Sequence, residues 1–120
     1  MTPATYNFTI YKGATWSREI TMKVDGVVVD LRGYSARMTI RRTYDSAPLL
    51  TLSSEGSPPA GIILSAGSPT PNILITITAE QTAALKFVNA VYDLELVYPD
   101  GVTVARLLQG VVTLNSEATK

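Results

Sequence analysis

The stretch YDLELVYPDG, residues 92–101, decides the fold class because a strand pattern runs directly into a turn signal. Its first half alternates apolar with acidic residues, which is the period of two expected of a strand with one buried face. Pro99-Asp100-Gly101 follows, and a glycine at that position supplies the positive φ that tight turns require. A second apolar run from Val102 to Leu114 completes a predicted closing hairpin, in which Gly110 is interpreted as the mark of a β-bulge.

The same period of two recurs outward from this hairpin through most of the chain. Asp25-Gly26 lies between two apolar runs and predicts another hairpin turn. Arg18 is the one charged residue on the apolar phase of its strand. The pattern predicts further strands at residues 6–11, 15–24, 27–30, 34–41, 49–52, 62–64 and 72–78.

One short helix is expected among these strands. Thr78 is followed three residues later by Gln81, which is the capping-box arrangement at a helix start, and we expect a helix of about two turns over Ala79–Lys86. Residues 53–72 are rich in proline, glycine and serine and are expected to form a loop with one short strand. Residues 115–120 are expected to fray.

These predictions describe one all-β domain over residues 1–120. Closely spaced strands with Asp-Gly turns and one short helix fit an antiparallel sandwich or a small barrel, and we favour the sandwich. The apolar phases predict a single core between two sheets, made of Trp16, Ile20, Met38, Ile40, Ile75, Tyr92, Leu94 and Leu96.

The composition argues against much of enzyme chemistry. The chain has no histidine and no cysteine, which are the commonest general base, metal ligands and thiol nucleophile. Ten basic residues balance ten acidic ones, so no overall field draws the chain to nucleic acid or to an anionic membrane. No apolar run is long enough to span a membrane, and no secretory signal is recognised. We expect a non-enzymatic protein made in a cytoplasm, without cofactor, metal, nucleic acid or membrane.

Three features suggest chemistry at first sight. Asp93 and Glu95 lie two apart on one strand face, as paired catalytic carboxylates can, but that spacing also describes the solvated face of any strand, which we favour. Trp16, Tyr34 and Tyr92 would suit a sugar-binding platform, yet each falls on the apolar phase of its strand, which favours core packing. Each Asp-Gly turn offers a single carboxylate, too few for a calcium loop.

The candidate binding residues are arginines and loop prolines. Arg37 and Arg41 project from the same strand face and Arg42 follows them, so this cluster is a candidate protein interface, with a phosphate-contacting stripe and plain solvation as alternatives. Arginine forks also make bidentate pairs with carboxylates. Pro58 and Pro59 lie in the 53–72 loop, which is a candidate docking arm because proline already restricts the free chain, with a mobile exposed loop as the alternative.

Five segments together resemble a family of small phage and prophage virion proteins. The family is related in pattern to the N-terminal domain of upper baseplate proteins, which attach receptor-binding proteins to tails. The segments are YNFTIYKGATW (6–16), VDLRGYSARMTIRR (29–42), AEQTAAL (79–85), YDLELVYPDG (92–101) and RLLQGVVTL (106–114). The 53–72 stretch departs from the family pattern.

The resemblance implies both a fold and a role. The fold is an immunoglobulin-like β-sandwich, and no family catalytic residue exists to carry over. The role is that of a virion structural protein made in the host cytoplasm, an adaptor in tail, baseplate or neck that binds other virion proteins, with homo-oligomers possible. A capsid decoration or cement protein is the first alternative, and a carbohydrate-binding β-sandwich module is the second.

Overall fold

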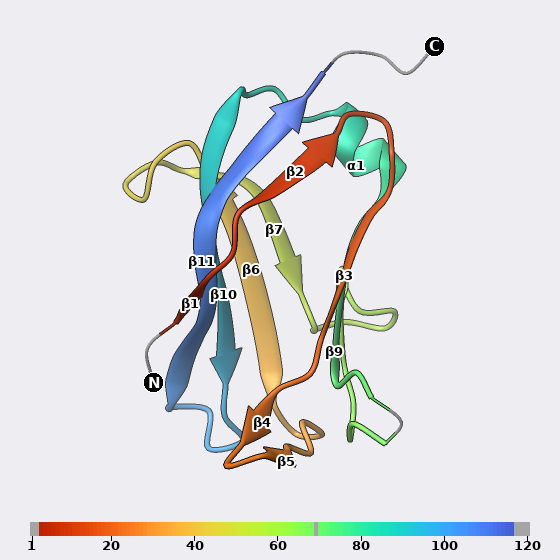
Figure 1. Ribbon diagram of the computed structural model, residues 1–120, viewed down its shortest axis with the longest axis vertical. Coiled ribbons are helices and arrows are strands. Elements are labelled where there is room, and N and C mark those ends of the chain that lie inside the picture. The colour runs from red at the N-terminus through yellow and green to blue at the C-terminus, as the bar shows by residue number, and fades with distance from the viewer. Residues whose placement is uncertain (1–2, 69, 117–120) are drawn as a thin grey trace.

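The computed structural model describes residues 3–68 and 70–116, and most of them lie in β-strands. The larger of its sheets has the strand order β1-β11-β10-β6-β7, and β2 also pairs with β11 (Figure 1). The strands of this large sheet are β1 (Ala4–Thr5), β2 (Phe8–Tyr11), β6 (Ser35–Arg41), β7 (Pro48–Ser53), β10 (Asn89–Val97) and β11 (Val104–Asn115).

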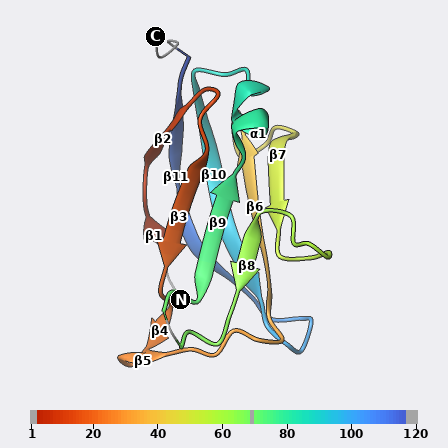
Figure 2. The same ribbon diagram turned by 90° about the vertical axis from the view of Figure 1, so that its right-hand side faces the viewer.

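A second, small sheet lies in front of the large one in Figure 2 and has the order β3-β9-β8. Its strands are β3 (Trp16–Ile20), β8 (Ile62–Leu64) and β9 (Ile73–Ile77). A separate two-stranded hairpin, β4 (Lys23–Val24) with β5 (Val27–Val28), lies at one end of the molecule, and the short helix lies at the opposite end (Figure 1).

One hydrophobic cluster fills the space between the two sheets, as predicted. Both sheets contribute to it through every second residue, because successive side chains of a strand point to opposite faces. Trp16 and Ile20 are only partly buried and pack against this cluster. The other six predicted core residues are buried: Met38, Ile40, Ile75, Tyr92, Leu94 and Leu96.

The two Asp-Gly turns are confirmed at hairpin tips. Gly26 has a φ of 78° and Gly101 a φ of 73°, and Asp25 also has a positive φ of 51°. Two consecutive positive φ values are the signature of the type I′ turn, whose twist matches that of the strands it joins.

The capping box is confirmed, but helix α1 (Ala79–Ala83) is shorter than the predicted Ala79–Lys86. The reason lies just beyond it, because Leu85 and Phe87 are both buried. Residues two apart on a helix point about 200° away from each other, so a continued helix could not turn both side chains into the core.

Two of the expected strands differ at the N-terminal end of the chain. The expected strand 6–11 is β2, and β1 precedes it without having been predicted. Both run parallel to β11, whereas an antiparallel arrangement was expected, because the chain crosses to the small sheet after β2 instead of turning back beside it. The expected strand 15–24 is divided into β3 and β4. At the break, the backbone N–H of Met22 donates to the side chain of Asn72 over 2.7 Å, so a side chain replaces a strand partner.

Gly110 does not mark a bulge. The irregularity in the β10–β11 pairing lies between Leu94 and Glu95, where Leu107 is the extra residue, and Gly110 pairs in register with Tyr92. A Cβ at Gly110 would instead collide with the carbonyl oxygen of Tyr6, so this glycine permits the N-terminal strand to approach β11.

The loop of residues 53–72 contains one short strand, β8, as expected. Its residue 69 lies outside the described part of the chain, as do residues 117–120 of the tail that was expected to fray. Asn115 still belongs to β11.

Candidate functional site

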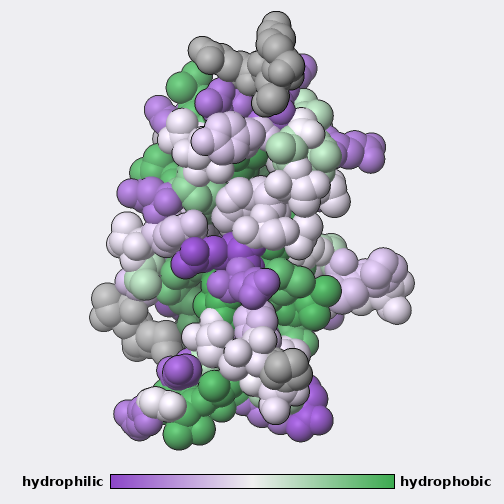
Figure 3. Space-filling view, turned by 45° about the vertical axis from the view of Figure 1, so that its right-hand side comes forward, coloured by the Kyte–Doolittle hydropathy of each residue, from purple (hydrophilic) through white to green (hydrophobic). Residues whose placement is uncertain are grey.

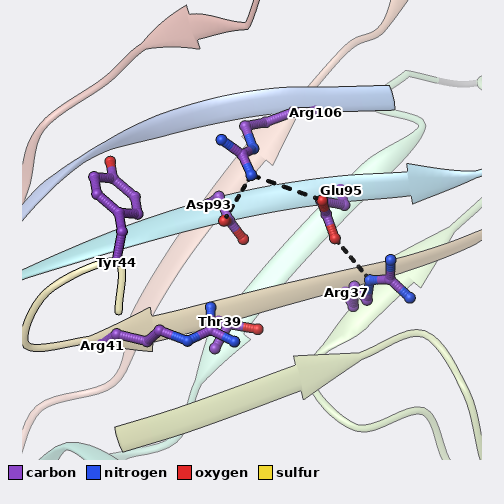
Figure 4. Close-up of a pocket in the computed structure, with 7 residues that line it drawn as sticks. All are labelled: Arg37, Thr39, Arg41, Tyr44, Asp93, Glu95 and Arg106. Atoms are coloured by element: carbon purple, nitrogen blue, oxygen red, sulfur yellow. Dashed lines mark hydrogen bonds and ion pairs between the residues drawn. The ribbon is translucent and has the colours of Figure 1, made fainter. Parts of the chain in front are cut away.

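A polar depression of about 510 Å³ lies on the outer face of the large sheet (Figure 4). Strands β6, β10 and β11 supply most of its lining, and one residue comes from the loop after β6. The side chains share the face turned away from the core, because they occupy alternate positions of each strand. They are Arg37, Thr39, Arg41, Tyr44, Asp93, Glu95 and Arg106.

Charges alternate across one row of this face. The strand register places Glu95 opposite Arg37 on one side and opposite Arg106 on the other. Nε of Arg37 donates to Oε1 of Glu95 over 2.8 Å, and Nη2 of Arg106 lies 3.9 Å from Oε2 of the same carboxylate. Opposite charges in directly facing positions stabilise a sheet, so this row is held in place by its own pairing.

Asp93 belongs to the same network but is more enclosed than the sequence suggested. Its carboxylate lies 3.4 Å from Nη2 of Arg106, and only 11% of its side chain is exposed. The prediction of a polar outer face is confirmed, although Asp93 is less exposed than residues on a solvated strand face usually are. It lies in the middle of the sheet, with Thr39 and Gln109 facing it from the neighbouring strands, so side chains surround it on both sides.

The predicted arginine cluster divides in two. Arg37 and Arg41 line the depression together, whereas Arg42 donates from Nη2 to the backbone carbonyl of Lys86 over 2.8 Å. Within the described residues, Arg41 has no ion pair. Neither Arg106 nor Tyr44 was singled out from the sequence. Arg106 could have been found by counting equal numbers of residues back from the Pro99-Asp100-Gly101 turn, which places it opposite Glu95.

The loop prolines lie away from the arginines. Residues 55–60 are exposed and project from the body of the protein (Figure 3). Pro59 lines a second depression of about 370 Å³ between β7 and β8, together with Thr51 and Ile63, whereas Pro58 is not part of its lining. The structure therefore does not bring the two predicted binding surfaces together.

The aromatic residues considered for sugar binding pack in or against the core, as favoured. Tyr92 is only 2% exposed, and the ring of Trp16 stacks on Phe8 with centroids 4.2 Å apart. Tyr34 is partly buried, and its ring lies 5.1 Å from that of Tyr98.

Two exposed acidic residues have local structural partners. The Arg32 side chain hydrogen-bonds to Asp30 and lowers the pKa of that carboxyl to about 2. Asp100 accepts hydrogen bonds from the hydroxyl and backbone N–H of Thr103 and from the N–H of Val102, and these lower its pKa. Both carboxylates fix turns of the chain.

Within residues 3–68 and 70–116, no three acidic side chains gather closely enough to hold a metal ion. The same part of the chain contains no helix with the length and apolar character needed to cross a membrane. Compared with known proteins, the chain matches no protein-family model and no curated protein.

Proposed function

We propose that this protein is a non-enzymatic structural component of a bacteriophage virion, an adaptor in the tail, baseplate or neck that binds other virion proteins. The observation that carries the binding role is the charged depression on the large sheet, because its ion pairs hold polar side chains in fixed positions on a rigid surface. Pre-ordered side chains lose little conformational entropy when a partner binds. The phage assignment rests on the sequence resemblance.

The fold that we propose is the immunoglobulin-like sandwich. Strand order supports it: β3, β9 and β8 correspond to the B, E and D strands of that fold, and β11, β10, β6 and β7 to its G, F, C and C′ strands. The segments that carry the family resemblance cover β2, β6, β10, β11 and the helix α1. The sheet order therefore supports the architecture that the resemblance implies.

The virion role is tested on purified particles. An epitope tag at the C-terminus, with gold-labelled antibody and electron microscopy, should place the protein on the tail, baseplate or neck. Label over the capsid surface would support the decoration protein instead. Absence of the protein from washed, infectious particles would overturn the virion role altogether.

The proposed surfaces are tested by incorporation of variants that still fold. Arg41→Ser probes the depression, because this residue has no ion pair within the described part of the chain to lose. Pro58→Ser with Pro59→Ser probes the exposed loop, and Arg32→Ser, on an arginine that lines neither depression, is the control. Reduced incorporation of a probe variant, beside a normal control, would support that surface. Normal incorporation of both probe variants would remove both surfaces from the proposal.

A further inference from the structure

The charges in the outer-face depression do not balance. Three arginines and two carboxylates line it, and both carboxylates are already paired, Glu95 mainly with Arg37 and Asp93 with Arg106. Arg41 is the guanidinium left over: among the described residues it makes no ion pair and no side-chain hydrogen bond, and it is partly buried.

The surroundings of Arg41 favour an interaction with a partner over simple hydration. The register places Val91 beside it, and Val111 lies on the far side of Val91 with 41% of its surface exposed. The ring of Tyr44, which is 52% exposed, also lines the depression (Figure 4). Water competes less for the ligand of a cation that has an apolar neighbour such as Val91, and tyrosine and arginine are both enriched where proteins bind each other.

We propose that this depression binds a carboxylate side chain from an acidic segment of a partner protein. The Arg41 guanidinium donates two parallel N–H hydrogen bonds to the carboxylate, and Tyr44 packs beside the segment. The planar fork of arginine matches the two oxygens of a carboxylate in this geometry. This inference deepens the proposed function and rests on its protein-binding role, because it names the chemistry of the partner.

The same charges argue for a single carboxylate over a polyanion. A nucleic acid would bring a row of phosphates across the face, and those beyond Arg41 would meet Asp93 and Glu95. The chain as a whole has a formal net charge of zero and supplies no field to offset that repulsion. An acidic protein segment can place one carboxylate at Arg41 and keep its remaining contacts apolar.

Titration of the full chain, labelled with nitrogen-15, tests the proposal by nuclear magnetic resonance. The probes are an acetylated and amidated pentapeptide of glycine, leucine, glutamate, leucine and glycine, the matched peptide with glutamine in place of glutamate, and an oligothymidine. The glutamate peptide should shift the Arg41 Nε–H signal and the backbone signals around Tyr44 and Val91. The glutamine peptide should bind about tenfold more weakly or worse, because it cannot form the charged pair. Added salt should weaken the glutamate complex.

Variants assign the effect to Arg41. Arg41→Gln should abolish the glutamate-dependent shifts, and Arg41→Lys should restore them only in part, because lysine keeps the charge without the fork. Arg32→Gln, which changes an exposed arginine paired with Asp30 elsewhere, should bind like the native chain. Thermal unfolding of each variant verifies that it is folded.

Equal shifts with the glutamate and glutamine peptides, unchanged binding by Arg41→Gln, or stronger binding of oligothymidine would each overturn the proposal. These results leave the virion role untouched, since that role is decided by the presence of the protein in particles. Conversely, absence from particles together with glutamate binding at Arg41 would overturn the virion role and keep the carboxylate site.

Discussion

At the residue scale, a buried asparagine holds together parts of the chain that sequence patterns treat as separate. Asn72 is 1% exposed, and its amide accepts from the N–H of Met22 and donates to the carbonyls of Met22 and Val29. Asn72→Ala removes the partner of the Met22 N–H and of the Val29 carbonyl, at about 1–3 kcal/mol for each group left unpaired in the interior, whereas the Met22 carbonyl still accepts from the N–H of Val29. We expect the free energy of unfolding, measured with urea, to fall by about 2 kcal/mol or more. Asn89→Ala, at an exposed asparagine, is the control, and an equal loss there would contradict this role.

Tyr92 gives the protein a predictable weakness in alkali. Burial raises the pKa of its hydroxyl well above the usual range, and the hydroxyl donates to the carbonyl of Tyr6. The folded chain therefore holds this proton more tightly than the unfolded chain does. The resulting stability is complete below the unfolded pKa of about 10 and is lost as the pH rises above it.

The Tyr92→Phe variant isolates this effect. It should be less stable than the native chain near neutral pH, because the Tyr6 carbonyl loses its donor, but it should lose less stability between about pH 9 and about pH 11. Urea unfolding at several pH values measures both quantities. Parallel losses in the two proteins over that range would show that Tyr92 keeps an ordinary pKa.

At the element scale, the N-terminal strands depend on the absence of a side chain at Gly110. A Cβ there would meet the carbonyl of Tyr6, whereas a Cβ at Gly101 would meet nothing within 4 Å and would strain only the positive φ of that turn. We expect Gly101→Ala to lower the free energy of unfolding by about 1–2 kcal/mol. Gly110→Ala should lower it by more, because the added Cβ collides with the Tyr6 carbonyl and the strands must move apart. Hydrogen exchange at the Tyr6 amide, which bonds to the Gln109 carbonyl, should accelerate only in Gly110→Ala. Exchange unchanged there would contradict the close-approach role.

The elements that the sequence predicts correctly are those specified by local chemistry. The period of two, the Asp-Gly turns and the Thr78–Gln81 capping box act over a few residues, and each appears at its expected place. The parallel docking of β1 and β2, the break at Met22 and the early end of α1 depend on contacts with distant parts of the chain. Period and propensity carry no information on such partners.

In the candidate site too, some residues can be placed from local sequence patterns and others only from contacts with distant parts of the chain. Arg37 and Arg41 could be placed on one face because they are four residues apart on one strand. The position of Arg42 could not be predicted in this way, because its partner, the Lys86 carbonyl, is 44 residues away. The ion pair between Asp93 and Arg106 joins residues that do not face each other in the register, because Gln109 lies opposite Asp93, so counting back from the turn does not find it. The surplus charge on Arg41 became visible only once these pairs had been assigned.

At the scale of the whole molecule, one core shared by two sheets should make unfolding a single cooperative event. Trp16 of the small sheet stacks on Phe8 of the large sheet, and it is the only tryptophan, so its fluorescence reports directly on the contact between the sheets. Circular dichroism reports on the strands themselves. The two signals should follow one transition with the same midpoint, as small domains with a single core do.

Truncation on either side of the core then tests whether the sheets depend on each other. Ile75 of β9 is 1% exposed and Leu94 of β10 is fully buried, and changing either to alanine should lower the free energy of unfolding by about 2–5 kcal/mol. Ile63→Ala in β8 is the control, because that side chain is 52% exposed and should cost little. Each core variant should lower the fluorescence and dichroism midpoints together, because neither sheet can keep its buried face without the other. A midpoint that moves in one signal alone would mean that the sheets unfold separately, and the charged face of the large sheet would then have to be treated as the surface of a smaller, independent unit.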